Sequence, residues 1–201
     1  YDNLKEIHFP TNIDDLMKAK SQIKICDFVK ELIYIDYINK KLQSEQNLDL
    51  KYDLEKILDK LDFKLTRSQL ISLKEILEDA NKDTLMNRLL IGDVGSGKTI
   101  VAIIAMLVFA LNGYQAAMMV PTEVLAIQQY EKNKGIIEGF GLKLGLLTGS
   151  IKNKDHIKQG LMAGDIDIVI GTHALIQEDV AFSDLRFVVN DEQHRFGVGQ
   201  R

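Results

Sequence analysis

The stretch Gly92-Asp93-Val94-Gly95-Ser96-Gly97-Lys98-Thr99 decides the fold of this chain. It has the form G-x-x-x-x-G-K-[ST], in which a glycine-rich backbone cradles phosphates. Residues 88–91 before it have the pattern of a short buried strand, and Lys98–Leu111 has the pattern of an apolar helix. A strand that turns through glycines into a helix directs backbone N–H groups and a positive dipole end at one place. The sequence therefore predicts a phosphate-binding loop, in which Lys98 reaches the terminal phosphates and Thr99 holds Mg²⁺.

The composition is that of a globular protein with one domain, or one domain and an appendage. Of 201 residues, 46% are apolar and 27% are charged, and the formal net charge is -4. A basic nucleic-acid binder is excluded for the chain as a whole, but not a local phosphate-binding face. The single cysteine, Cys26, excludes an internal disulfide and a cysteine-based zinc site, which fits a reducing compartment such as the cytoplasm.

Neither a membrane span nor a leader is indicated. The longest apolar stretch, residues 100–111, is too short to cross a bilayer. The first residues do not have the pattern of a signal peptide. Since the chain does not begin with Met, we expect an excised fragment.

Two regions of the chain differ in pattern. Residues 1–62 predict a helical linker with helices at 12–20, 25–42 and 53–61 and a polar loop at 44–50. Residues 63–201 alternate strands and helices, which predicts an α/β fold with a parallel sheet between helices. We expect strands at 88–91, 116–120, 143–147, 166–170 and 187–190, and helices at 68–78, 98–111, 123–137 and 156–163.

A second acidic motif completes the predicted phosphate chemistry. The apolar strand at 187–190 ends in Asp191-Glu192. Because ligands bind at the carboxyl ends of parallel strands, Asp191 is expected near the magnesium held by Thr99. Glu192 would orient or deprotonate an attacking water, since phosphoryl transfer depends on positioning and charge neutralisation.

Several short polar motifs follow predicted strands or begin predicted helices. Thr66-x-x-Gln69 fits a capping box, and Pro121-Thr122-Glu123 fits a helix start. Thr148-Gly149-Ser150 and Gly171-Thr172-His173 are small turns rich in donors, which suit sugar-phosphate contact without base reading. Each of these motifs also fits a plain structural turn, so their functional weight comes from their order along the chain.

Together the motifs resemble those of a known helicase family. Asp191-Glu192-Gln193-His194 is similar to the DExH box of superfamily 2 helicases and translocases. With Gly92 to Thr99 and Gly171 to Gln177, it resembles the RecG family of bacterial ATP-dependent DNA helicases, over residues 60–201 and more weakly upstream. The transcription-repair coupling translocases are the nearest relatives. Gln193 and Ala174 favour the RecG family over them.

The resemblance implies roles for individual residues. Gln69, with Phe63, would recognise adenine, and Lys98, Asp191 and Glu192 would be catalytic. Gln193 and His194 would couple ATP hydrolysis to DNA. The implied ATP site comprises Phe63, Gln69, Gly92, Asp93, Gly95, Ser96, Gly97, Lys98 and Thr99, with Mg²⁺ on Thr99 and Asp191. The implied DNA-backbone contacts are Pro121, Thr122, Glu123, Thr148, Gly149, Ser150, Gly171, Thr172 and His173.

The resemblance also implies what the whole protein does. It would be a cytoplasmic, monomeric motor that remodels stalled forks and branched DNA in repair and recombination. The fold would be a RecA-like domain that is incomplete at its C-terminus, and the isolated chain would show little or no turnover. The rival interpretations are a P-loop kinase or transporter ATPase and an ATP-binding scaffold without turnover.

Asn190 departs from the family pattern, which has an apolar residue at the end of this strand. A buried Asn without partners would cost about 1–3 kcal/mol. We therefore expect Asn190→Ile to stabilise the domain.

Overall fold

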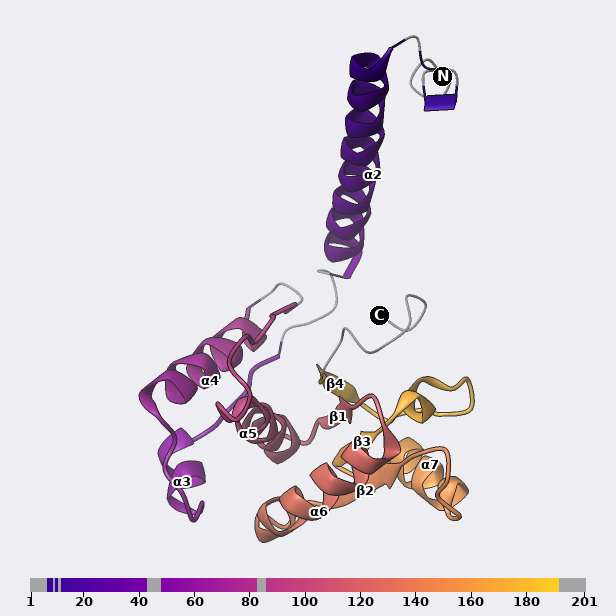
Figure 1. Cartoon of the computed structure of the whole chain (residues 1–201). Helices are drawn as coiled ribbons and strands as arrows, with labels where there is room; N and C mark the ends of the chain where they lie inside the picture. The colour runs from indigo at the N-terminus through magenta and orange to yellow at the C-terminus, as the bar shows by residue number, and fades with distance from the viewer. Residues whose placement is uncertain (1–6, 9, 11, 43–47, 83–85, 192–201) are drawn as a thin grey trace. The chain divides into compact units, whose positions relative to one another are not determined.

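The computed structural model describes residues 7–8, 10, 12–42, 48–82 and 86–191 (Figure 1). Its contacts divide the chain into two units. One comprises Tyr1–Leu48 and Lys82–Met86, and the other comprises Asp49–Asn81 and Asn87–Arg201. The second unit carries the phosphate-binding loop and the sheet. No helix in the described ranges has both the length and the apolar character needed to cross a membrane.

The described part of the first unit contains the long helix α2 (Ile13–Leu42). Asn12 begins it, because the backbone N–H of Asp15 donates to Asn12 Oδ1 at 2.8 Å. The prediction of two helices, 12–20 and 25–42, was wrong. The intervening residues 21–24, Ser-Gln-Ile-Lys, contain neither Gly nor Pro, so nothing in them ends a helix. Of the predicted loop at 44–50, residues 44–47 lie outside the described part.

The second unit is an α/β fold with the predicted parallel sheet. The strand order is β2-β3-β1-β4, and every pair is parallel. Its helices are α3 (Leu54–Asp59), α4 (Arg67–Ala80), α5 (Lys98–Leu111), α6 (Glu123–Gly139), α7 (Lys154–Ala163) and η1, a 3₁₀ turn (His173–Ile176). Its strands are β1 (Gln115–Met119), β2 (Leu144–Leu147), β3 (Ile168–Gly171) and β4 (Leu185–Asn190).

The two central strands are covered on both faces. Every residue of β1 and β3 is buried. Since successive side chains of a strand point to opposite faces, helices must cover both sides of the sheet. The apolar helix α5 contacts β1, β3 and β4, and α6 contacts β2 and β3. Phe109 near the end of α5 stacks on Phe187 of β4, with ring centroids 4.5 Å apart.

The prediction of a strand at residues 88–91 was wrong. This segment belongs to no strand of the sheet, and Leu89 and Ile91 are 75% and 82% exposed. The sheet of the described part ends at β4, and residues 88–91 pair with none of its strands. A strand forms only where its N–H and C=O groups find a partner, so an apolar pattern alone is not sufficient.

β4 is an edge strand of the described sheet, and this changes the interpretation of Asn190. Asn190 is exposed rather than buried, and Val188 on the same strand is 59% exposed. The expected cost of a buried, unpaired Asn therefore does not arise in this structure.

Candidate functional site

The phosphate-binding loop ends at the N-terminus of α5, and this N-terminus has no side-chain cap. Gly97 is the N-cap residue and accordingly lacks a side chain that could accept from the helix. By contrast, Thr66 caps α4 and Thr122 caps α6 through their hydroxyl groups. The first N–H groups of any helix lack intrahelical partners, and an anion can satisfy them. The start of α5 is therefore suited to a phosphate group.

Lys98 folds back onto its own loop. Its Nζ donates to the carbonyl oxygens of Gly92 at 2.7 Å and Asp93 at 2.9 Å. An ammonium has three donors, so one of them remains available to a ligand while two hold the loop closed. Ser96 N donates to Asp93 O at 3.1 Å and tightens the same turn. These residues of the predicted ATP site therefore lie together.

Gln69 joins the start of α4 to the phosphate loop. Its Oε1 accepts from Thr66 N at 2.9 Å, and its own N–H donates to Thr66 Oγ1 at 3.3 Å, which is the predicted capping box. Its Nε2 also donates to Ser96 O at 2.9 Å. The contact is close, because a Cβ added to Gly97 would lie 2.3 Å from Gln69 Nε2. Phe63, the other residue assigned to adenine, is 38% exposed.

Arg88 holds the segment before the loop against α4. Its Nε donates to Asp79 Oδ2 at 2.8 Å, and its Nη1 donates to Glu75 Oε2 at 2.6 Å. Hydrogen bonding to Asp79 raises the pKa of Arg88 above its ordinary value, with Glu75 adding to the effect. Sequence reasoning missed this contact, since no local spacing links residue 88 to residues 75 and 79. Arg88 and Gln69 thus attach the loop to the same helix on both sides.

The acidic end of β4 lies beside the end of β1. Asp191 N donates to Met119 O at 2.9 Å, which extends the pairing of the two strands by one residue. Asp191 is half-buried, and Thr99 is half-buried in the first turn of α5. Glu192, Gln193 and His194 lie outside the described residues. No cluster of three or more potential metal-ligating side chains occurs among the residues the structure describes.

The three polar turns predicted to contact DNA lie at the carboxyl edge of the sheet. Thr148 follows β2 and is fully buried, and its Oγ1 lies 3.5 Å from Ser150 Oγ. Thr172 follows β3 and is 1% exposed, and its Oγ1 has no hydrogen-bond partner in the described part of the chain. Gly171 admits no side chain, because a Cβ there would lie 2.2 Å from Leu147 O.

The sequence did not predict the contact that joins two of these turns. Glu123, the first residue of α6, accepts from Ser150 N at 2.9 Å through Oε1. Its pKa lies below the ordinary carboxyl value, first because of a hydrogen bond from the Ser150 side chain. Backbone hydrogen bonds from Ser150 and Gly149 and the charge of Lys154 lower it further, while burial opposes them.

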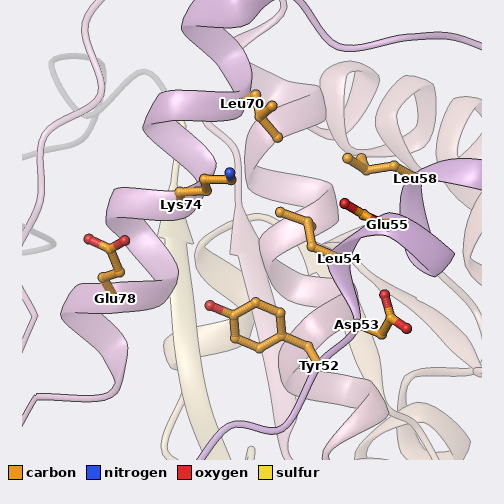
Figure 2. Close-up of a pocket in the computed structure, with 8 residues that line it drawn as sticks. All are labelled: Tyr52, Asp53, Leu54, Glu55, Leu58, Leu70, Lys74 and Glu78. Atoms are coloured by element: carbon orange, nitrogen blue, oxygen red, sulfur yellow. The ribbon is translucent and has the colours of Figure 1, made fainter.

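A cavity of about 700 Å³ lies in the same unit, between the segment around α3 and the helix α4. Figure 2 shows its lining side chains, in which leucines alternate with charged and aromatic groups. They are Tyr52, Asp53, Leu54, Glu55, Leu58, Leu70, Lys74 and Glu78. None of them belongs to the phosphate loop or to the carboxyl edge of the sheet, so this cavity is not the predicted nucleotide site.

The glycine-rich loop, the uncapped helix and the parallel sheet define a RecA-like P-loop domain that binds nucleotide phosphates. Residues 66–201 match the DEAD/DEAH box helicase family, and the chain belongs to that family. Membership implies the use of ATP.

The chain is also similar to RecG proteins. It is 51% identical to the ATP-dependent DNA helicase RecG of Aquifex aeolicus over 166 residues, which are 82% of this chain and 21% of that protein. It is 42% identical to RecG of Borreliella burgdorferi over 203 residues, covering 100% of this chain and 30% of that protein. A solved structure of RecG bound to a three-way DNA junction is 41% identical, with a TM-score of 0.67, and covers 98% of this chain and 28% of that one. The predicted resemblance to RecG is confirmed, and the chain spans less than a third of these relatives.

Proposed function

We propose that this chain is the ATP-binding part of a RecG-like DNA helicase, which couples ATP hydrolysis to movement along DNA and remodels forks and branched junctions. The observation that carries the proposal is the uncapped N-terminus of α5, with Lys98 at its start and its Nζ on the loop carbonyls. In this proposal the ammonium leaves those carbonyls and turns to the β- and γ-phosphates of ATP. The released carbonyls are exposed to water, so the exchange costs little.

The nucleotide would be held by backbone N–H groups at the start of α5 and by Lys98. The Gln69 side-chain amide already bonds Thr66 and Ser96, and it would recognise adenine with its second N–H and its second lone pair. Phe63 would cover the base. Thr99 and Asp191 would hold Mg²⁺, which supplies charge neutralisation between the phosphates. Glu192 would orient the attacking water, and Gln193 and His194 would couple ATP hydrolysis to the bound DNA.

The proposed DNA contact is the carboxyl edge of the sheet. Gly149 and Ser150 after β2, and His173 after β3, expose hydroxyl, imidazole and backbone groups there, next to Pro121 and Thr122. Such groups bind sugar and phosphate and read no bases, which suits a motor that moves along any sequence. Thr148, Gly171 at the end of β3, and Thr172 are also assigned to this contact, but they are buried. We further propose that the whole protein works in the cytoplasm as a monomer.

The test is Lys98→Ala in the intact protein that carries this chain. ATPase activity should fall by at least about 100-fold, because a charge that stabilises the transferred phosphoryl group is lost. Binding to a labelled fork should stay within about twofold, because Lys98 lies on the phosphate loop and not among the turns at the carboxyl edge. The matched control is Lys132→Ala on α6, which removes an exposed lysine and should change neither property. Retained turnover in Lys98→Ala would refute the assignment.

A further inference from the structure

Glu123 was assigned by resemblance to the DNA backbone, but its geometry points to another role. Its Oε1 accepts from Ser150 N at 2.9 Å. The contact is close-packed, since a Cβ added to Gly149 would lie 2.7 Å from the same oxygen. A carboxylate repels a phosphate, and this one already uses the donors of the turn. Glu123 therefore does not itself hold a DNA phosphate.

The contact spans the edge of the sheet. Glu123 follows β1 and Ser150 follows β2, yet β1 and β2 are not neighbours, because β3 lies between them. At the end of β3, Gly171 O accepts from Val120 N at 2.9 Å, and Thr172 N donates to Leu147 O at 3.2 Å. The hydrogen bond from Ser150 to Glu123 thus closes a ring of contacts around the end of β3. All three polar turns belong to this ring.

We propose that Glu123 is a positioning residue, which fixes the turn at residues 148–150 across the end of β3 so that its exposed residues, Gly149 and Ser150, face a backbone phosphate. This inference rests on the proposed function, since it assumes that the carboxyl edge binds DNA. Gly149 and Ser150 are exposed at this turn, whereas Thr148 is fully buried and its Oγ1 lies 3.5 Å from Ser150 Oγ. The hydrogen bonds that hold the turn also lower the pKa of Glu123, as expected where a carboxylate accepts from nearby donors.

The test compares Glu123→Ala, Glu123→Gln and Glu131→Ala in the intact protein, with a fluorescein-labelled duplex as the probe. Glu123→Ala should weaken duplex binding about tenfold, because the turn loses its charge-assisted anchor. Glu123→Gln should stay within about threefold of the unmodified protein, because an amide oxygen still accepts from Ser150 N. Glu131 is exposed on the same helix, so its removal changes the charge of α6 equally and should leave binding unchanged.

A second variant tests the same contact from the other side. Gly149→Ala places a Cβ against Glu123 Oε1 and should also weaken duplex binding. In the double variant with Glu123→Ala, the alanine at 149 should add little, because the oxygen that it displaces is gone. Gly149→Ala alone decides the question if Glu123→Ala does not fold.

Nucleotide affinity without DNA should be unchanged in every variant. This separates a positioning role from general destabilisation. Glu123→Ala that binds duplex as well as the unmodified protein overturns the inference. Tighter binding overturns it too, and would mean that the carboxylate competes with phosphate. If the unmodified protein binds no DNA, the proposed function fails instead.

Discussion

Gly97 is the position where a single methyl group should disturb the loop most. Its φ of +80° lies in the left-handed region, and a Cβ there would lie 2.3 Å from Gln69 Nε2. Gly97→Ala should cost about 1–2 kcal/mol in backbone strain. The displaced Gln69 then loses its bond to Ser96 O, which adds about 1 kcal/mol. We expect a total loss of about 2–3 kcal/mol in the free energy of unfolding.

Two other glycines provide controls for strain alone. Gly113, with φ +82°, and Gly95, with φ +80°, would each place a Cβ in open space, with nothing within 4 Å. Gly113→Ala and Gly95→Ala should therefore each lower the free energy of unfolding only by the backbone strain, about 1–2 kcal/mol. Urea denaturation followed by circular dichroism measures all three variants under the same conditions.

The contact with Gln69 is tested by a double variant. In a Gln69→Ala background, Gly97→Ala should cost no more than Gly113→Ala does, because the amide that it displaces has been removed. Equal losses for Gly97→Ala and Gly113→Ala in the unmodified background would refute the reasoning. So would an unchanged excess cost of Gly97→Ala after Gln69 is truncated.

Three further outcomes follow from the described contacts. Thr172→Val should raise the free energy of unfolding by about 1 kcal/mol, because it removes a buried hydroxyl that has no partner among the described residues. A thermal melt showing a loss would mean that the hydroxyl is bonded. Asn190→Ile should change stability by less than about 0.5 kcal/mol, since Asn190 is exposed, and urea denaturation showing a larger gain would mean that β4 is covered in solution. The folded-state pKa of Glu123 is lowered, so its contribution to stability is present above the unfolded pKa and is lost as pH falls through the folded value. An NMR titration of its carboxyl carbon should give a midpoint below the ordinary range, and a midpoint at or above that range would contradict the contact with Ser150.

Local patterns predicted the elements whose determinants are close together in sequence. The helix Lys98–Leu111 begins and ends where the glycine loop and the apolar run placed it. The capping box of Thr66 and Gln69 was confirmed in both of its hydrogen bonds. The strands of the sheet shifted by only one or two residues from their predicted bounds, because buried apolar runs mark them clearly.

Features that depend on distant partners were not predictable in this way. Residues 88–91 have the composition of a strand, but strand formation depends on a neighbour that local pattern does not reveal. The ion pairs of Arg88 with Glu75 and Asp79 could not be predicted without knowing which elements are adjacent in space. The same is true of the hydrogen bond from Ser150 to Glu123. The exposure of Asn190 likewise depends on β4 being the last strand of the described sheet.

The stacked rings of Phe109 and Phe187 connect the far end of α5 to β4. Phe109 lies 11 residues beyond Lys98 in α5, and a helix rises by about 1.5 Å per residue, so the two residues are about 16 Å apart. One end begins at the phosphate loop, and the other rests on β4, four residues before Asp191. If a phosphate bound at the loop tilted α5, the tilt would displace β4, the strand that leads to the acidic box. The residues between the two ends of the helix would not need to change conformation.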